Sequence, residues 1–382
     1  MNQVFDPKLD NYKLVVVGSG LYGLTFARLW AEQMNSRCLV IERRSHIGGN
    51  AWSEIDPESG IEVHTYGSHL FHTSNDRVWS FVNRFTTFND YRHRVYSRYQ
   101  DQFFSIPINL QTLSQFFKRP FTPHEAQALL ASFSEGRSEP TSFEDEAIRT
   151  IGHDLYMAFF KGYTQKQWQL EPKLLPRETF TRIPVRFDFN PYYFNDTHEG
   201  LPSKGYGDFL TQLATHPMID ISLNTDYFEI PNERSAGQLL VYTGPLDKYF
   251  SYCYGHLRWR TLDFSLERLP ISDFQGNAVI NYPEVEYPFT RIHEFRHLNP
   301  ERSYPNDMTI IMREYSRAAT QEDEPYYPVN SLDDRIMLTK YRELMKAEKN
   351  VLFGGRLGTY KYLDMHMAIA SAISAFEAKF QK

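Results

Sequence analysis

The sequence contains few cysteines and no long apolar segment. Cys38 and Cys253 are the only thiols in 382 residues, and their separation matches no metal-binding spacing. Two cysteines cannot form a disulfide framework in a chain of this length, which favours a reducing compartment. No segment approaches the roughly 18 apolar residues of a membrane-spanning helix, and residues 1–13 lack the basic-then-apolar pattern of a signal peptide. We therefore predict a soluble, cytoplasmic protein with no structural disulfide and no metal site.

An excess of positive charge is also missing. The formal net charge is −6, so the field of the whole protein repels polyanions, and we do not expect nucleic acid as a partner. A hydrophobic content of 41% and a charged content of 23% are those of a globular protein rather than a disordered one. A chain of 382 residues is long enough for two or three domains with a buried core.

The N-terminal region carries the pattern of a dinucleotide-binding unit. Residues 13–17 (KLVVV) predict a buried parallel strand, and the glycine-rich segment 18–23 (GSGLYG) follows it immediately. Residues 24–34 have the apolar positions of a helix, and a second strand at 38–41 leads to Glu42. The glycine motif therefore lies between a strand and a helix, which is the context that dinucleotide binding requires.

Each residue of this unit has a physical task. Gly18 permits the tight turn, Gly20 lets the backbone approach a pyrophosphate, and Gly23 lets helix and strand pack closely. The N-terminus of the helix offers unpaired N–H groups and a positive dipole to the phosphates. Glu42 lies near the spacing of about 20 residues expected for the acid that binds the ribose hydroxyls. A purely structural glycine turn is the alternative.

Two further glycine pairs favour FAD over NAD. The pair at 48–49 follows the acid, as in FAD proteins whose corresponding loop wraps the flavin phosphates and ribityl chain, and a structural turn is again the alternative. Near the C-terminus, a strand ending at Phe353 leads into the pair at 354–355 and then into an apolar helix from about Met365. The N-terminus of such a helix suits a flavin edge or a phosphate. No second G-x-G-x-x-G occurs, which counts against a flavin reductase with two dinucleotide domains.

The rest of the chain divides into a helical part and a sheet-forming part. Between Asp76 and Thr164, apolar residues recur at spacings of three and four, which predicts amphipathic helices with Asn, Thr or Ser caps, and a hairpin at 92–107. Residues 251–330 hold alternating segments typical of an antiparallel sheet. The predicted fold is α/β: a discontinuous Rossmann-like FAD-binding domain, a helical insertion and an antiparallel β-sheet domain. The expected boundaries are 1–81, 201–250 and 331–382 for the FAD-binding domain, 82–165 for the helical domain with the substrate lid, and 166–200 and 251–330 for the sheet domain.

Four segments mix Arg or Lys with aromatic residues outside the clear helices. Arginine binds phosphate through two nitrogens, tyrosine hydroxyls add neutral donors, and aromatic faces stack on a base or pack on a sugar. Salt bridges and packing explain any one such segment, but four of them in a flavoprotein favour a phosphorylated substrate with a base and a sugar. The segments are KGYTQKQW (161–168), TRIPVRFDFNPYYF (181–194), YPFTRIHEF (287–295) and GRLGTYKYLDM (355–365).

These motifs, in this order, resemble those of the bacterial flavin-dependent UDP-galactopyranose mutases over nearly the whole chain. The resemblance rests on GSGLYG, VIERRSHIGGNAW, YGSHLFHT (66–73), REYS (313–316) and the four segments above. It implies an isomerase that interconverts UDP-galactopyranose and UDP-galactofuranose without net redox change, with FAD that must be reduced. The reduced flavin N5 would attack the anomeric carbon as UDP departs. It further implies a homodimer, an external reductant such as NAD(P)H and a role in cell-surface polysaccharide biosynthesis.

The resemblance assigns roles to individual residues at the substrate. Arg182, on a mobile lid, and Arg291 would hold the UDP diphosphate from opposite sides and stabilise the charge of the leaving group. Phe159 and Tyr163 would hold the uracil, and Trp168 would lie on the lid. The tyrosines expected to donate to the phosphates are Tyr193, Tyr327 and Tyr362, and further substrate contacts are expected at Thr164, Arg260 and Glu314.

On the cofactor side, His72 is expected beside the isoalloxazine and the galactose, as a catalytic residue together with the two diphosphate-binding arginines. His69 is its neighbour. A hydrogen-bonded buried imidazole is the alternative for either histidine. The other residues expected at the cofactor are Gly18, Gly20, Gly23, Glu42, Gly49, Asn50, Gly355, Arg356, Asp364 and Met365.

Several alternatives stay open at this point. His93 occupies a position where we expect asparagine in several relatives, and the sequence does not decide between UDP-galactose and UDP-N-acetylgalactosamine. A flavin amine-oxidase-like or carotenoid-desaturase-like oxidoreductase shares the FAD-binding architecture but has no need of arginines for a diphosphate. A non-catalytic FAD-containing protein would bind the same ligands and leave the sugar unchanged.

Overall fold

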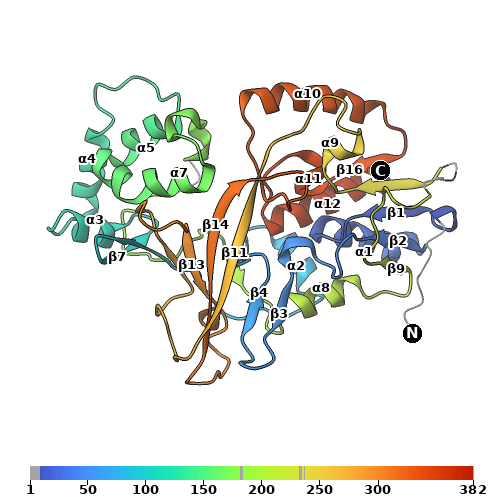
Figure 1. Cartoon of the computed structure of the whole chain (residues 1–382), viewed down its shortest axis with the longest axis horizontal. Coiled ribbons are helices and arrows are strands. Elements are labelled where there is room, and N and C mark those ends of the chain that lie inside the picture. Colours follow the sequence, from blue (N-terminus) through green and yellow to red (C-terminus); the bar gives the residue numbers. More distant parts are fainter. Residues whose placement is uncertain (1–8, 181–183, 232–234, 236, 382) are drawn as a thin grey trace.

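The computed structural model describes residues 9–180, 184–231, 235 and 237–381. Two sheets dominate it. A parallel sheet lies on one side of the molecule, and a larger, mainly antiparallel sheet connects it to a group of helices on the other side (Figure 1). This arrangement confirms the α/β fold predicted from the sequence.

The parallel sheet follows the predicted nucleotide-binding pattern. Its strand order is β16-β10-β1-β2-β9, so that N-terminal, middle and C-terminal parts of the chain all contribute, as predicted. Every side chain of β1 and β2 is buried, which explains why these strands are made of apolar and largely β-branched residues. The bounds are β1 Leu14–Val17, β2 Cys38–Ile41, β9 Ile219–Ser222, β10 Leu239–Tyr242 and β16 Val351–Phe353.

Two long helices pack beside this sheet. α1 Leu21–Met34 begins directly after the glycine motif, and α12 Met365–Phe380 lies against it, with the ring centroids of Phe26 and Phe376 5.4 Å apart. Such edge-to-face contacts add stability beyond the area they bury. The other helices that accompany this part are η1 Leu9–Asn11, η2 Gly49–Ala51, α2 Asp76–Val82, α8 Tyr206–Ala214, α9 Leu246–Tyr249, α10 Leu332–Ala347 and α11 Gly355–Thr359.

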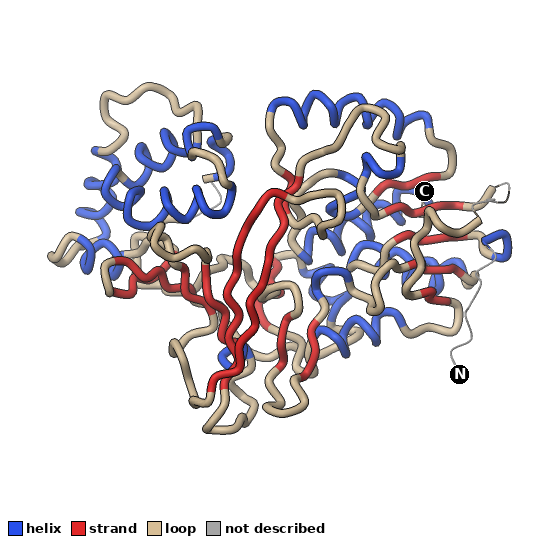
Figure 2. Tube along the Cα trace, in the orientation of Figure 1, coloured by secondary structure: helices blue, strands red, loops and turns tan. Residues whose placement is uncertain are grey.

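A seven-stranded sheet forms the middle of the molecule, with two long strands running through it (Figure 2). Its order is β15-β11-β14-β13-β12-β6-β7, and it is antiparallel except where β12 pairs with β6. The predicted hairpin forms as β6–β7, but it extends this sheet, although we assigned it to the helical segment 82–165. A hairpin has the same local signals in either setting, so the sequence did not show which edge accepts it. The bounds are β6 Val95–Tyr99, β7 Gln102–Ile106, β11 Trp259–Leu269, β12 Val279–Asn281, β13 Arg291–Glu294, η6 Phe295–Leu298, β14 Thr309–Ala318 and β15 Tyr327–Pro328.

The helices of the insertion begin at the predicted caps. Asn109, Thr122 and Ser142 each accept a hydrogen bond from a backbone N–H in the first turn of the helix that follows. The helical segment that begins after Ser142 is interrupted at Gly152 and continues through a π-helical turn, a feature that often marks functional segments. The bounds are α3 Leu110–Phe116, α4 Pro123–Ser132, α5 Phe143–Ile151, α6 His153–Leu155, η3 Tyr156–Lys161 and α7 Gly162–Trp168.

Short ladders connect distant segments. β5 Phe71–Thr73 pairs with β8 His198–Gly200, and β3 Ser53–Ile55 pairs with β4 Glu62–His64. The described part of segment 166–200, which we assigned to the sheet domain, lies outside the seven-stranded sheet. It forms the end of α7, the turns η4 Pro172–Leu174 and η5 Arg177–Thr179, and β8. The division into domains therefore stays a prediction. None of the helices in the described residues has both the length and the apolar character that crossing a membrane requires.

Candidate active site

A first cavity opens at the carboxyl ends of β1, β2 and β10. Val17, Ile41 and Tyr242, the last residues of these strands, line it. Ligands of open α/β sheets bind at this edge. Most of the residues predicted at the cofactor also line the cavity: Gly18, Gly20, Glu42, Gly49, Asn50, His69, Gly355, Arg356, Asp364 and Met365.

The three glycines of the motif have the surroundings that dinucleotide binding requires. Gly18 has a φ of +96°, and a Cβ there would lie 2.1 Å from Thr243 Oγ1. A Cβ on Gly23 would lie 2.1 Å from the carbonyl oxygen of Gly18, so Gly23 lets α1 approach β1 closely. A Cβ on Gly20, in contrast, would meet no atom within 4 Å. The backbone at Gly20 is therefore open to a pyrophosphate.

Glu42 is held through both of its oxygens. Oε2 accepts hydrogen bonds from the backbone N–H (2.9 Å) and the hydroxyl (2.7 Å) of Ser19, and Oε1 accepts one from the N–H of Arg44 (2.9 Å). A carboxylate has about four lone-pair sites. These bonds fix the orientation of Glu42 and leave it acceptor capacity, which fits the acid that binds the ribose hydroxyls.

The second glycine pair packs onto the first. Gly48 donates from its N–H to the carbonyl oxygen of Ser19 (2.9 Å), and its φ of +91° together with Leu210 leaves no room for a side chain. Gly49 lines the cavity. The sequence left a structural turn and a cofactor loop as alternatives, and this segment is both a tight turn and a wall of the cavity.

The sequence analysis missed Arg44, which also lines the first cavity. Its Nη2 donates to Asn50 Oδ1 (2.9 Å) and Glu324 Oε2 (2.6 Å), and its guanidinium lies 4.5 Å from the centre of the Tyr66 ring. Its Nη1 is buried and has no hydrogen-bond partner among the described residues. Such a nitrogen fits an anionic ligand. The two arginines directly after Glu42 were the signal available in the sequence.

A second cavity of about 360 Å³ lies between the seven-stranded sheet, α7 and the start of α12. Its size is in the range of small-molecule sites. Most residues predicted at the substrate line it, although they come from segments far apart in the sequence. These residues are Phe159, Tyr163, Thr164, Trp168, Tyr193, Arg291, Glu314, Tyr327 and Tyr362.

The two cavities meet. His69, Arg356, Asp364 and Met365 line both of them. Arg356 is fixed at this junction because its Nη1 and Nη2 donate to two backbone carbonyl oxygens, at 3.0 and 2.7 Å. A long ligand in the first cavity can therefore present its far end to a second ligand in the other.

The half-buried Arg291 and the buried Glu314 form an ion pair in the wall of the second cavity. Glu314 Oε2 accepts hydrogen bonds from Arg291 Nε (2.9 Å) and His293 Nε2 (3.1 Å), and His293 Nδ1 then accepts from the Ser68 hydroxyl (2.8 Å). Burial opposes ionisation, yet Arg291 lowers the pKa of Glu314 to about 2. Burial would lower the pKa of Arg291, but Glu314 raises it above its usual value. The pair therefore keeps an oriented positive charge in the cavity.

A row of polar side chains crosses the sheet in this wall. Ser97, Asn281, Arg291 and Glu314 are register partners on the neighbouring strands β6, β12, β13 and β14, and all four line the cavity. Ser97 Oγ, Asn281 Oδ1 and Gln167 Oε1 are buried without a hydrogen-bond partner among the described residues. Because these oxygens belong to residues that line the cavity, they can accept hydrogen bonds from a polar ligand there. The sequence analysis missed Ser97, Asn281 and Gln167, because no local signal reveals this register.

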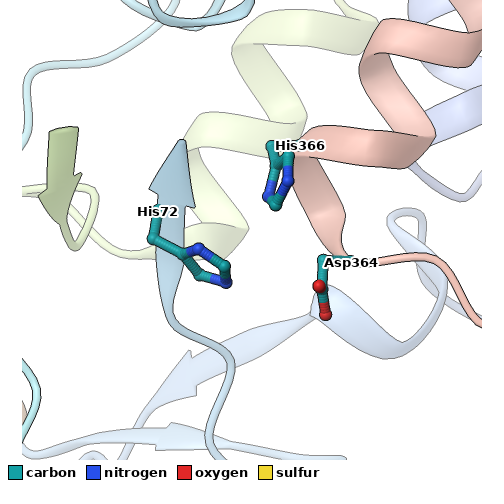
Figure 3. Close-up of side chains that lie close together, drawn as sticks. All are labelled: His72, Asp364 and His366. Carbon is teal, nitrogen blue, oxygen red and sulfur yellow. The ribbon is translucent and has the colours of Figure 1, made fainter. Parts of the chain in front are cut away.

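His72 reaches from β5 toward Asp364 and His366 at the start of α12 (Figure 3). Its Nδ1 donates to Asp196 Oδ2 (2.6 Å), and its ring stacks on Phe194 with centroids 3.7 Å apart. In its neutral form the ring therefore carries its lone pair on Nε2. The side-chain N and O atoms of His72, Asp364 and His366 that could bind a metal ion lie within 4.8 Å of one another. Among the described residues near the junction, these three form the group whose spacing suits a metal ion.

Burial keeps two further imidazoles neutral. The pKa values of His69 and His93 are lowered to about 3 by burial. His69 Nδ1 lies 2.8 Å from the carbonyl oxygen of Gly67, and His93 Nδ1 lies 2.9 Å from the Tyr91 hydroxyl. His69 borders both cavities and His93 borders the second. These two histidines offer neutral donors and acceptors there, and arginine supplies the positive charge.

Comparisons with known proteins agree with this geometry. Residues 158–362, more than half of the chain, match the family model described as UDP-galactopyranose mutase, and residues 16–85 match the NAD(P)-binding Rossmann-like domain. A probable UDP-galactopyranose mutase of Klebsiella pneumoniae is 43% identical over 367 residues, which cover 96% of this chain and 94% of the relative. The chain belongs to the UDP-galactopyranose mutase family.

Two further comparisons show the range of this family. The dTDP-fucopyranose mutase of Escherichia coli is 38% identical over 94% of this chain and 96% of its own length. The crystal structure of a reduced UDP-galactopyranose mutase matches with a TM-score of 0.74 at 16% identity, over 96% of this chain and 93% of the other, which confirms the fold. Relatives named for different sugar nucleotides therefore resemble this chain to a similar degree.

Two further arginines were predicted at the substrate in this member of the UDP-galactopyranose mutase family. Arg182 lies outside the described residues, so its place at the diphosphate stays a prediction. Arg260 is 3% exposed and lines neither cavity. Its Nε donates to the carbonyl oxygen of Gln167 (3.1 Å) and its Nη1 to Gln169 Oε1 (3.1 Å), so it holds the end of α7. The sequence alone does not distinguish an arginine that binds a substrate from one that holds a helix, because both lie among aromatic residues.

Proposed function

We propose that this member of the family interconverts the pyranose and furanose forms of UDP-linked galactose and requires reduced FAD to do so. One observation carries the proposal: a glycine-lined cavity opens, at His69, Arg356, Asp364 and Met365, into a cavity with a half-buried arginine. Ring-size isomerisation needs this arrangement, because the cofactor must reach the sugar while the diphosphate is held in place.

The first cavity fits FAD. Gly20 leaves the backbone open to the pyrophosphate, Glu42 keeps acceptor capacity for a ribose, and Arg44 Nη1 offers a donor without a partner among the described residues. The N-terminus of α1 favours phosphate at the same place. When bound and reduced, FAD supplies an electron-rich N5 that acts as a nucleophile toward a glycosyl carbon. The residues shared by the two cavities would hold its ring system.

The second cavity fits the diphosphate. Arg291, oriented by Glu314, would pair with the phosphates and stabilise the charge that develops on them as UDP departs. Tyr327 and Tyr362 stack with ring centroids 5.8 Å apart, and burial raises the pKa of both hydroxyls. Both therefore stay protonated and can donate to phosphate oxygens.

The base and the sugar would occupy the two ends of this cavity. At one end, Phe159 and Tyr163 offer aromatic faces to a base, and the oxygens of Ser97 and Asn281 would accept hydrogen bonds from its N–H or from the ribose hydroxyls. At the other end, the sugar would lie near the junction with the cofactor. The row of polar side chains across the sheet thus supports a ligand that runs from base to phosphate.

His72 is the group best placed to move a proton. Asp196 accepts from His72 Nδ1 and from the Ser74 hydroxyl (2.8 Å), which orients the ring and leaves Nε2 to face Asp364 and His366. Opening and closing a sugar ring transfers a proton to and from an oxygen, and an oriented imidazole can carry it. We assign this proton to His72 Nε2.

The identity of the sugar nucleotide admits a second candidate. The 38% identity to a dTDP-fucopyranose mutase supports dTDP-linked fucose as a substrate to be compared with UDP-galactose, beside UDP-N-acetylgalactosamine. A net oxidation of the substrate, as in an amine-oxidase-like enzyme, would not require the Arg291–Glu314 ion pair in the cavity wall.

Product analysis tests the proposal. Dithionite-reduced protein is incubated without oxygen with each of the three sugar nucleotides and, separately, with UDP-galactofuranose, while oxidised protein serves as the matched control. We expect reduced protein alone to equilibrate the two ring forms of UDP-galactose, without stoichiometric use of reductant. Oxidation of the sugar would contradict the proposal. If the enzyme isomerised dTDP-fucose and neither UDP-sugar, dTDP-fucose would take the place of UDP-galactose as the proposed substrate.

A cytoplasmic location, a homodimer and an external reductant such as NAD(P)H belong to the same proposal. The reaction consumes no electrons overall, but the cofactor must be reduced once before it can act. A furanose product would serve the synthesis of cell-surface polysaccharide.

A further inference from the structure

Lys166 lies in a ring of backbone carbonyl groups. It belongs to α7, between Tyr163 and Trp168, which line the second cavity, whereas Lys166 itself lines neither cavity. An ammonium group has three N–H donors, so four converging acceptors satisfy it completely. The carbonyl oxygens that accept from its Nζ are those of Tyr282, Glu284 (2.8 Å), Tyr287 (2.9 Å) and Phe289 (3.0 Å).

These acceptors all belong to one loop. Residues 282–290 join β12 to β13, and β13 begins with Arg291. Burial lowers the pKa of Lys166 to about 8, which reflects how little water reaches its amino group. If the amino group were removed, few water molecules would replace its bonds to the loop.

Gly162 brings the helix backbone against the same loop. A Cβ on Gly162 would lie 2.3 Å from the carbonyl oxygen of Pro283 and 3.4 Å from the side chain of Val285. Only a glycine permits this approach. Lys166 follows about one helical turn later, so two successive turns of α7 contact the loop on one face.

The C-terminal end of α7 also contacts the long strands. The carbonyl oxygen of Gln167 accepts hydrogen bonds from Arg260 Nε (3.1 Å) and the Ser316 hydroxyl (2.6 Å). Arg260 belongs to β11 and Ser316 to β14. α7 is therefore held by the 282–290 loop through Gly162 and Lys166, and by the β11–β14 pair through Gln167.

We propose that Lys166 is a positioning residue that locks α7 onto the 282–290 loop and so keeps the base-binding residues at a fixed distance from Arg291. The inference rests on the proposed function, which places the base at α7 and the diphosphate at Arg291. Contacts to the base are the same in the ground state and the transition state. Loosening α7 should therefore weaken binding and leave the chemical step nearly unchanged.

The substitution Lys166→Met tests whether the hydrogen bonds of Lys166 position α7, because the methionine side chain has a similar length and no hydrogen-bond donor. We expect the Kd for UDP, measured by isothermal titration on flavin-loaded protein, and the KM for the UDP-sugar to rise roughly tenfold, while kcat stays within about threefold. Gly162→Ala should raise the same two constants, since its Cβ pushes α7 away from Pro283. Lys173→Met, at an exposed lysine of η4, is the matched control and should equal the wild type.

Several results would contradict the proposed positioning role of Lys166. An unchanged Kd and KM in Lys166→Met, or a loss in kcat with KM unchanged, would show that Lys166 does not position the base site. If Lys166→Met does not fold, the same two constants in Gly162→Ala decide the question. Failure of the wild type to bind UDP would instead refute the proposed function, and the lock with it.

Discussion

The two cavities are built from different materials. The first takes backbone from glycines, from the ends of three parallel strands and from the N-terminus of α1, beside side chains such as Glu42 and Arg44. The second is made of side chains from the seven-stranded sheet, α7 and the start of α12. A backbone site has little freedom to change its ligand, whereas a side-chain site can be altered one residue at a time. The relatives named for UDP-galactopyranose and dTDP-fucopyranose are consistent with this difference.

The largest effect is expected from Arg291→Ala. The variant loses the charge that would stabilise the departing diphosphate, so kcat/KM should fall about 10²- to 10³-fold, roughly 3–4 kcal/mol. It also leaves Glu314 buried without its partner, which should destabilise the fold by about 3–5 kcal/mol. Flavin content, read from the absorbance of the purified protein, should stay near that of the wild type because the first cavity is untouched.

Arg291→Lys is the control for this variant. It keeps the charge and loses the planar arrangement of nitrogens, so it should retain the fold and recover part of the activity. Loss of flavin together with activity in Arg291→Ala would show that the two cavities are not independent.

Two glycine substitutions distinguish an effect on the stability of the fold from an effect on ligand binding in the first cavity. Gly18→Ala should lower Tm by several degrees and abolish flavin binding, because its φ is +96° and its Cβ would meet Thr243. Gly20→Ala should leave Tm nearly unchanged and still lower the flavin content, because its Cβ enters the space proposed for the pyrophosphate. Equal losses of Tm in both variants would argue against that assignment of Gly20.

Acid should destabilise the second cavity through its buried histidines. The pKa of His93 is about 3 in the folded protein, below its ordinary value of 6.5. The unfolded chain therefore binds more protons between about pH 6.5 and pH 3, and stability falls as the pH falls through this window. In His93→Asn the free energy of unfolding, measured in urea from pH 7 to pH 4, should fall less steeply, by up to about 1.4 kcal/mol per pH unit. Parallel curves for wild type and variant would contradict the prediction.

The smallest effect is expected from Ser97→Ala. The Ser97 hydroxyl has no partner among the described residues, so its removal should leave Tm unchanged or slightly higher. The Kd for UDP should rise by a factor of about 2–10, the value of one hydrogen bond. Ser105→Ala on the adjacent strand is the matched control, because the Ser105 hydroxyl accepts a hydrogen bond from Asn109. This variant should have a lower Tm and an unchanged Kd for UDP. If Ser97→Ala lowered Tm without changing the Kd for UDP, and Ser105→Ala raised that Kd, Ser97 would not belong to the binding site.

Local signals predicted the first cavity well. A strand followed by glycines, a helix and an acid are neighbours in the sequence, and caps such as Asn109 and Ser142 act within one helical turn. The alternating pattern over residues 251–330 also predicted an antiparallel sheet, because alternation is a property of each strand alone.

The second cavity depends on register, which local patterns do not contain. Ser97 meets Asn281 only because β6 pairs in parallel with β12, a pairing between distant segments. The same cause separates the two arginines: Arg291 is placed beside Glu314 in the cavity, and Arg260 is placed at the end of α7. The resemblance to a family identified most of the lining, but it did not show how these side chains are held.

The position of β16 and α12 in the chain has a consequence for how the protein is made. Asp364 and Met365 border both cavities, and they follow the glycine motif by several hundred residues in a polypeptide that leaves the ribosome N-terminal end first. The glycine motif is therefore translated well before these two residues. A nascent chain that has not yet reached Met365 lacks one wall of both cavities, so the complete cofactor site forms only after this residue has been translated.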